Sequence, residues 1–118
     1  AKAGVALAAK MQKGGKGKER AFTFTGALLV GKAAHFLKDY DTAEYFYEFC
    51  AETATRLESG EKMVESYAGL LDLYLDAKRY GDAADVCERF IEVKGPREVD
   101  NARDYFLEKL VQSRALQG

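Results

Sequence analysis

Apolar residues recur every three or four positions through most of the chain, which is the spacing that places them on one face of an α-helix. The first such stripe begins at Phe24 and continues through Ala27, Val30, Gly31 and Ala34. The alternation of apolar and polar residues that is typical of a β-strand occurs nowhere in the sequence. The pattern therefore predicts an all-α protein.

Short turn sequences divide the periodic part of the chain into five predicted helices. The turns are DYD at 39–41, SGE at 59–61, RYGD at 79–82 and GP at 95–96. We expect a first helix from residue 24 and further helices over about 41–57, 61–77, 82–93 and 97–116. Asp41 is the predicted N-cap of the second helix, with Glu44 completing a capping box. The apolar stripe of the last helix is Val99, Ala102, Phe106, Leu110 and Val111.

An internal repeat relates two of the predicted helical hairpins. Tyr40 corresponds to Tyr80 and Ala43 to Ala83, and the interval is the same in both pairs. Each pair lies at the start of a predicted helix that follows another predicted helix. Helical hairpins in tandem are the sequence signature of a helical-repeat architecture.

These hairpins resemble the tetratricopeptide repeat, whose pattern is W-x2-L-G-x2-Y followed by A-x3-F. In the first unit, Gly31 falls on the glycine position, and Ala43 with Tyr47 matches A-x3-F. The second unit matches at Tyr67, Leu70, Tyr74 and Ala83, but it has Leu71, Cys87 and Phe90 where other residue types are usual. The resemblance implies a solenoid of antiparallel hairpins in which Gly31 packs against Ala43, and Leu71 against Ala83.

The resemblance also gives the domain organisation of the chain. One repeat would cover about 24–58, a second about 61–94, and a C-terminal capping helix about 97–116, within a repeat domain over 21–118. The step from Ala43 to Ala83 is similar to that of a longer subclass of these repeats.

In the family, the first helices of the repeats line a concave groove that holds an extended peptide or a helix of a partner protein. The matching positions here are Leu28, Lys32, His35 and Phe36 in the first unit and Glu65, Ala68, Asp72, Leu75 and Asp76 in the second. One wall is apolar with a cation and the other is acidic, so a partner segment with basic and apolar side chains would be complementary. An ordinary solvated face is the alternative. Members that bind chaperone tails clamp a terminal carboxylate, which Asp72 would repel.

Four aromatic rings crowd five positions of the second predicted helix. Phe46 and Tyr47 belong to its apolar stripe, whereas Tyr45 and Phe49 are four residues apart and share a different face. This second pair either packs against residues 1–13 or a neighbouring helix, or forms the surface of a homodimer or partner complex.

Charge is distributed unevenly along the chain. Residues 1–20 carry six basic residues and one acidic residue, which leaves 12 basic and 18 acidic residues in 21–118. Within this basic segment, 3–13 has the composition of a short helix and 14–20 that of a flexible linker. The segment is either a solvated arm or a contact for anionic lipid or nucleic acid. An RNA-binding helical repeat is the alternative function, although only this segment supports it, because the body is acidic.

Catalytic and metal-binding motifs are missing from the sequence. Its single histidine is His35, and it contains no cluster of metal-ligating residues, phosphate loop or serine nucleophile motif. Cys50 and Cys87 lie among apolar residues, so we expect buried free thiols, with a disulfide or a reactive thiol as the alternatives. Free thiols indicate a reducing intracellular compartment, such as the cytoplasm or an organelle matrix. The sequence therefore indicates a protein without cofactor or enzymatic activity, which acts as an adaptor or scaffold in the assembly or regulation of a complex.

Overall fold

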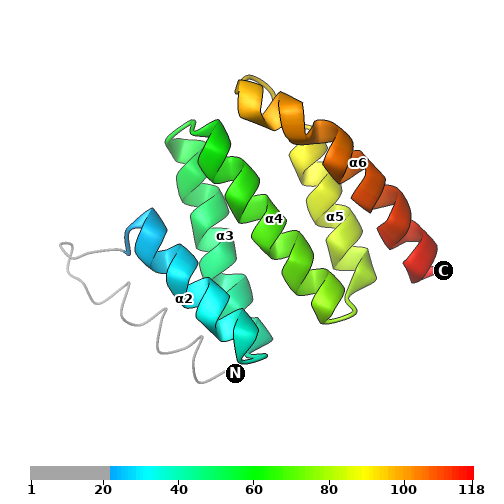
Figure 1. Ribbon diagram of the computed structural model, residues 1–118, viewed down its shortest axis with the longest axis horizontal. Helices are drawn as coiled ribbons and strands as arrows, with labels where there is room; N and C mark the ends of the chain where they lie inside the picture. Colours follow the sequence, from blue (N-terminus) through cyan, green and yellow to red (C-terminus); the bar gives the residue numbers. More distant parts are fainter. Residues whose placement is uncertain (1–21) are drawn as a thin grey trace.

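The computed structural model describes residues 22–118, and within this range the chain forms five α-helices and no strand (Figure 1). The helices are α2 (Phe24–Phe36), α3 (Tyr40–Arg56), α4 (Gly60–Asp76), α5 (Tyr80–Ile91) and α6 (Arg97–Gln117). The prediction of an all-α protein is confirmed for this part of the chain. The basic segment 1–20, with its expected helix over 3–13 and linker over 14–20, lies outside the described residues.

The five helices are arranged in two layers. α2, α4 and α6 lie next to one another in the front layer of Figure 1, and α3 and α5 lie behind them. α4 contacts each of the other four helices, whereas α3 and α5 have no close approach of their backbones. An ion pair between Glu48 of α3 and Arg89 of α5 spans the space between these two helices. α4 therefore has α3 and α5 on one side, and its opposite face lies between α2 and α6.

Three turns of the same geometry connect α2 to α5, and they recur at a constant interval along the chain. Lys38, Glu58 and Lys78 each adopt a positive φ, at 64°, 54° and 60°. The amide after each of them donates to a carbonyl five residues earlier, as in Asp39 N–H to Ala34 O at 2.8 Å. This left-handed residue and its returning hydrogen bond end a helix in the Schellman manner.

The cap at the start of α3 differs from the one predicted. The N-cap of α3 is Asp39, whose carboxylate accepts from Thr42 N–H at 3.4 Å, and not Asp41. Glu44 does not complete a capping box, because its carboxylate instead accepts hydrogen bonds from Tyr74 and Arg79. These long-range partners are invisible to a local capping rule, and they tie α3 to the end of α4.

Tyr47 of α3 lies between two glycines that belong to different helices. A Cβ atom at Gly31 of α2 would come within 3.1 Å of the Tyr47 ring, and a Cβ at Gly69 of α4 would come within 2.9 Å. The closest neighbours of Gly31 are thus Tyr47 and Phe46, one turn along α3 from the predicted partner Ala43. Both positions favour glycine because α2 and α4 each approach the Cδ1 and Cε1 atoms of the same ring.

The buried face of α6 is shifted relative to the prediction. Val99 and Phe106 are fully buried, and Phe106 stacks on Phe90 of α5 with ring centroids 3.9 Å apart. Val111, which was predicted to lie in the core, is 68% exposed, and Ser113 is buried in its place. An α-helix has about 3.6 residues per turn, so residues that follow one another at a spacing of four gradually rotate away from the buried face. The apolar stripe of α6 therefore ends at Leu110.

Candidate binding groove

A groove of about 670 Å³ lies between α2 and α4. It contains seven of the nine residues that were predicted to line a partner site: Lys32, His35, Phe36, Glu65, Ala68, Asp72 and Asp76. The positions implied by the resemblance to the tetratricopeptide repeat thus lie together, although Lys32 and Asp76 are distant in the chain.

The other two predicted residues lie elsewhere. Leu28 is only 9% exposed and belongs to the core cluster together with Phe24 and Ala27, so its prediction as a groove residue is wrong. Leu75 is half-buried and packs against the same core. Both are leucines, for which burial in the core is more favourable than exposure on a groove wall.

Asp76 gathers three side chains at one end of the groove. Its Oδ2 atom lies 3.1 Å from Nε2 of His35 and 3.0 Å from Nζ of Lys38, and the hydroxyl of Tyr40 donates to it at 3.5 Å. The hydrogen bonds from Lys38 and His35 lower the pKa of the Asp76 carboxyl, and the hydrogen bond to Asp76 raises the pKa of Lys38. This cluster connects α4 to α2 and to the turn that follows α2.

Two other carboxylates in the groove remain available for a ligand. Glu65 and Asp72 of α4 form no ion pair with any residue in 22–118, and both are exposed. Burial raises the pKa of Asp72, although the nearby charges of His35 and Lys109 oppose this shift. A carboxyl group that is partly desolvated and has no direct partner gains more from an incoming cation than a fully hydrated one does.

The floor of the groove is apolar, and the α2 wall carries an aromatic ring beside Lys32 and His35. Tyr47, Ala68 and Gly69 line it between the acidic residues, and burial together with the charge of Asp72 raises the pKa of Tyr47 to about 12. On the α2 wall, the side chain of Phe36 is 83% exposed. The groove therefore offers an exposed aromatic ring opposite two carboxylates.

Sequence reasoning did not identify three residues of the groove, namely Lys38, Tyr47 and Gly69. Gly69 could have been found, because it lies on the same helical face as Glu65 and Asp72. Lys38 lies in the left-handed turn after α2, and Tyr47 comes from α3 and packs against glycines of α2 and α4. Neither condition can be read from the spacing of residues.

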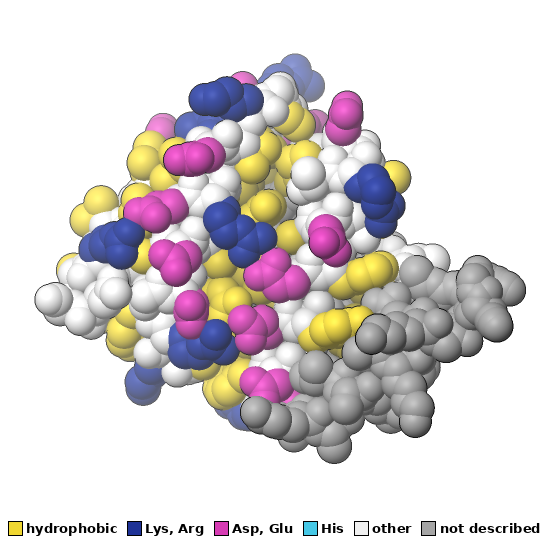
Figure 2. All heavy atoms as spheres, turned by 180° about the vertical axis from the view of Figure 1, so that it is seen from behind, with side chains coloured by type: hydrophobic (Ala, Val, Ile, Leu, Met, Phe, Trp, Pro, Cys, Tyr) yellow, Lys and Arg dark blue, Asp and Glu magenta, His cyan; other side chains and the backbone are white. Residues whose placement is uncertain are grey.

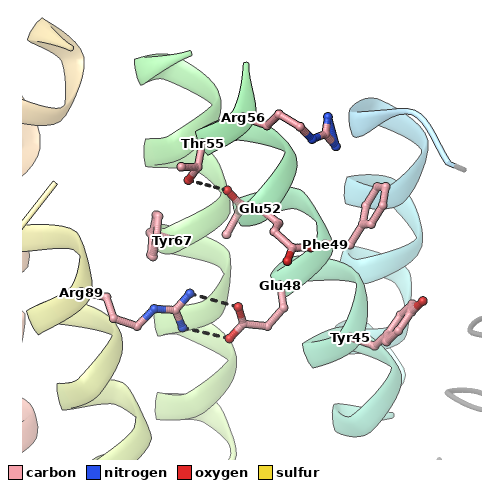
Figure 3. A pocket seen from close by; sticks show the side chains of 9 residues that line it. Tyr45, Glu48, Phe49, Glu52, Thr55, Arg56, Tyr67 and Arg89 are labelled. Atoms are coloured by element: carbon pink, nitrogen blue, oxygen red, sulfur yellow. Dashed lines mark hydrogen bonds and ion pairs between the residues drawn. The ribbon is translucent and has the colours of Figure 1, made fainter. Parts of the chain in front are cut away.

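A second hollow, of about 600 Å³, lies on the opposite face of the protein between α3 and α5. Figure 2 shows this face, with acidic side chains running down its middle. Arg89 spans the hollow with two hydrogen bonds to Glu48, at 3.0 and 3.1 Å, and its guanidinium lies 5.2 Å from the centroid of the Tyr67 ring (Figure 3). The hydrogen bonds to Glu48 raise the pKa of Arg89. The hollow is thus already spanned by its own ion pair.

Tyr45 and Phe49 also line the second hollow, but their rings point away from Tyr67 towards the side of α2 (Figure 3). Both are half-buried and pack against the core, and the ring of Tyr45 meets Phe46 edge to face at 5.1 Å. Their role as a dimer or partner surface stays a prediction.

Both cysteines are free and fully buried, as predicted. Burial raises the pKa of the Cys50 thiol to about 12 and that of Cys87 to about 11. Within residues 22–118 no cluster of three metal-ligating side chains occurs. No helix in the same range has the length and apolar character needed to span a membrane.

Comparisons of the chain with protein-family models, with curated proteins and with solved structures gave no significant match.

Proposed function

We propose that this protein is a non-catalytic interaction module that binds a segment of a partner protein in the groove between α2 and α4. The observation that carries the proposal is the groove itself, which combines an exposed aromatic ring with two carboxylates that have no ion-pair partner in the described chain. The pattern of contacts between helices supports a solenoid like that of tetratricopeptide repeats, because each helix packs on the next one and α4 also contacts α2 and α6. An adaptor or scaffold function in complex assembly follows from this interpretation.

The charges of the groove define the partner segment. Glu65 and Asp72 lie on one face of α4, seven residues and therefore about 10.5 Å apart. In an extended polyproline-II segment, side chains at i and i+3 point to the same side about 9 Å apart. A segment with two basic residues at this spacing would place both cations on the carboxylates. Because a polyproline-II helix has about three residues per turn, the residues between them would point away from that face of α4, one of them towards the ring of Phe36 on the α2 wall.

Fluorescence anisotropy with a labelled peptide tests the proposal. The peptide carries two arginines at i and i+3, with leucine and alanine between them, and its partners are the wild-type protein and a Glu65→Gln, Asp72→Asn variant. Two ion pairs of about 0.5–1 kcal/mol each predict that the variant binds about 5- to 30-fold more weakly.

The matched control removes the same charges from the opposite face, through Glu52→Gln on α3 and Asp85→Asn on α5, both of which are exposed. This control variant should bind the peptide as tightly as the wild type. Equal affinity of the wild-type and groove variants, or an absence of binding at millimolar protein concentration, would refute the proposal. A peptide with its arginines at i and i+2 tests the spacing separately from the function.

A further inference from the structure

The outer face of α6 carries two partly exposed apolar side chains, Leu107 and Val111. α6 packs on α4 and α5 along one side, and its other side forms an edge of the protein (Figure 1). On that outer side, Val111 is 68% and Leu107 42% exposed. The two residues are four positions apart, so their side chains are neighbours on the helix surface. Together they form a short apolar stripe near the middle of a helix of 21 residues.

Charged residues flank this stripe in an order that is self-complementary. Asp104 precedes Leu107 by three residues, and Arg114 follows Val111 by three residues. Since the spacing 3–4–3 is symmetric, a second α6 that runs antiparallel places its Val111 on Leu107 and its Arg114 on Asp104. Every contact then occurs twice, once in each direction, which is what a twofold axis between identical surfaces requires.

We propose that two copies of this chain associate through antiparallel α6 helices, with Asp104, Leu107, Val111 and Arg114 as the contact residues. The proposal goes beyond the groove, which lies between α2 and α4. Asp104 is exposed and forms no ion pair with any residue in 22–118. Arg114 donates to Glu88 of α5 and to Gln117, but its guanidinium has five N–H groups and retains donors for a second carboxylate.

The size of the contact sets the strength of the association. The stretch from Asp104 to Arg114 is about 15 Å long, so the contact is smaller than the roughly 1,200–2,000 Å² of standard protein interfaces. The dimer is therefore weak and reversible, and it forms at high protein concentration. Salt weakens it further, because the flanking ion pairs are near the surface.

Charge reversal combined with mixing tests the proposal by sedimentation equilibrium. The Asp104→Arg variant and the Arg114→Asp variant each place like charges opposite one another in a homodimer, so each should self-associate at least about tenfold more weakly than the wild type. An equimolar mixture of the two variants should dimerise again, because each chain then supplies the charge that the other requires. Far-ultraviolet circular dichroism verifies that both variants are folded.

The mixing experiment separates a specific contact from a folding defect. The Arg114→Asp change also removes the ion pair with Glu88, and a merely damaged protein would not recover on mixing. Asp85→Arg on α5 is the control and should leave the association constant unchanged. A wild-type protein that stays monomeric at millimolar concentration, or single variants that dimerise as well as the wild type through another surface such as Tyr45 and Phe49, would overturn the proposal.

Discussion

We predict that the substitution Glu58→Gly stabilises the protein, because Glu58 is one of the three turn residues that adopt a left-handed backbone conformation. Glu58 has a φ of 54° and is exposed, and no other side chain in 22–118 forms an ion pair with it. Holding a residue with a Cβ atom in this conformation costs about 1–2 kcal/mol. Glycine avoids this cost but loses about 0.4–1 kcal/mol through the larger freedom of the unfolded chain. The net gain for Glu58→Gly is about 0.5–1 kcal/mol.

Urea and thermal unfolding followed by far-ultraviolet circular dichroism measure this gain, which corresponds to a rise of about 2–8 °C in Tm. The matched control is Glu52→Gly, the same chemical change in the interior of α3, where it should cost about 0.5–1 kcal/mol. Lys78→Gly should stabilise in the same way, and the two gains should add because the two turns lie at opposite ends of α4. A loss of stability for Glu58→Gly equal to that of Glu52→Gly would refute the reasoning.

Three further predictions follow from the buried core. Gly69→Ala should lower the free energy of unfolding by about 1–3 kcal/mol, because the added Cβ atom would lie 2.9 Å from the Tyr47 ring. Thermal unfolding measures this loss of stability. If the loss were equally large in a Tyr47→Leu background, the Tyr47 ring would not be its cause. Cys50 and Cys87 should react with a thiol reagent only as fast as the protein unfolds, because both side chains are fully buried and their pKa values are raised to about 12 and 11. Immediate labelling of the folded protein at neutral pH would disprove this prediction. The raised pKa values also mean that, above the ordinary thiol value of 9.0, the unfolded chain loses these protons before the folded one does. The free energy of unfolding should therefore fall with rising pH, by up to about 1.4 kcal/mol per pH unit for each thiol, and urea titrations should give a flatter dependence for Cys50→Ala.

The hydrophobic period of the sequence was sufficient to predict the helices, and the resemblance to the tetratricopeptide repeat supplied most of the groove residues. Residues such as Lys32, Glu65 and Asp72 follow from their helical faces once two helices are known to lie side by side. The expectation that these two helices are neighbours comes from the correspondence of Tyr40 with Tyr80, which shows which positions are equivalent in the two hairpins.

The remaining features depend on contacts between distant parts of the chain. Glu44 fits a local capping rule, but a hydroxyl and a guanidinium from Tyr74 and Arg79, far along the chain, bind its carboxylate instead. Val111 continues an apolar spacing, yet α6 runs past α5 so that Ser113 faces inward. Local propensity is overridden wherever packing offers a stronger partner, and periodicity alone carries no information about that partner.

The constant interval between equivalent turns makes the architecture extendable. The turns at Lys38 and Lys78 have the same backbone path, so the stretch of chain from one to the next forms a block whose two ends match. A duplicate of that block, inserted at either turn, would join the existing chain without a new loop and would present its own stretch of front-layer helix. We therefore expect that a chain lengthened by one such unit of two helices keeps the hydrogen bonds of each junction.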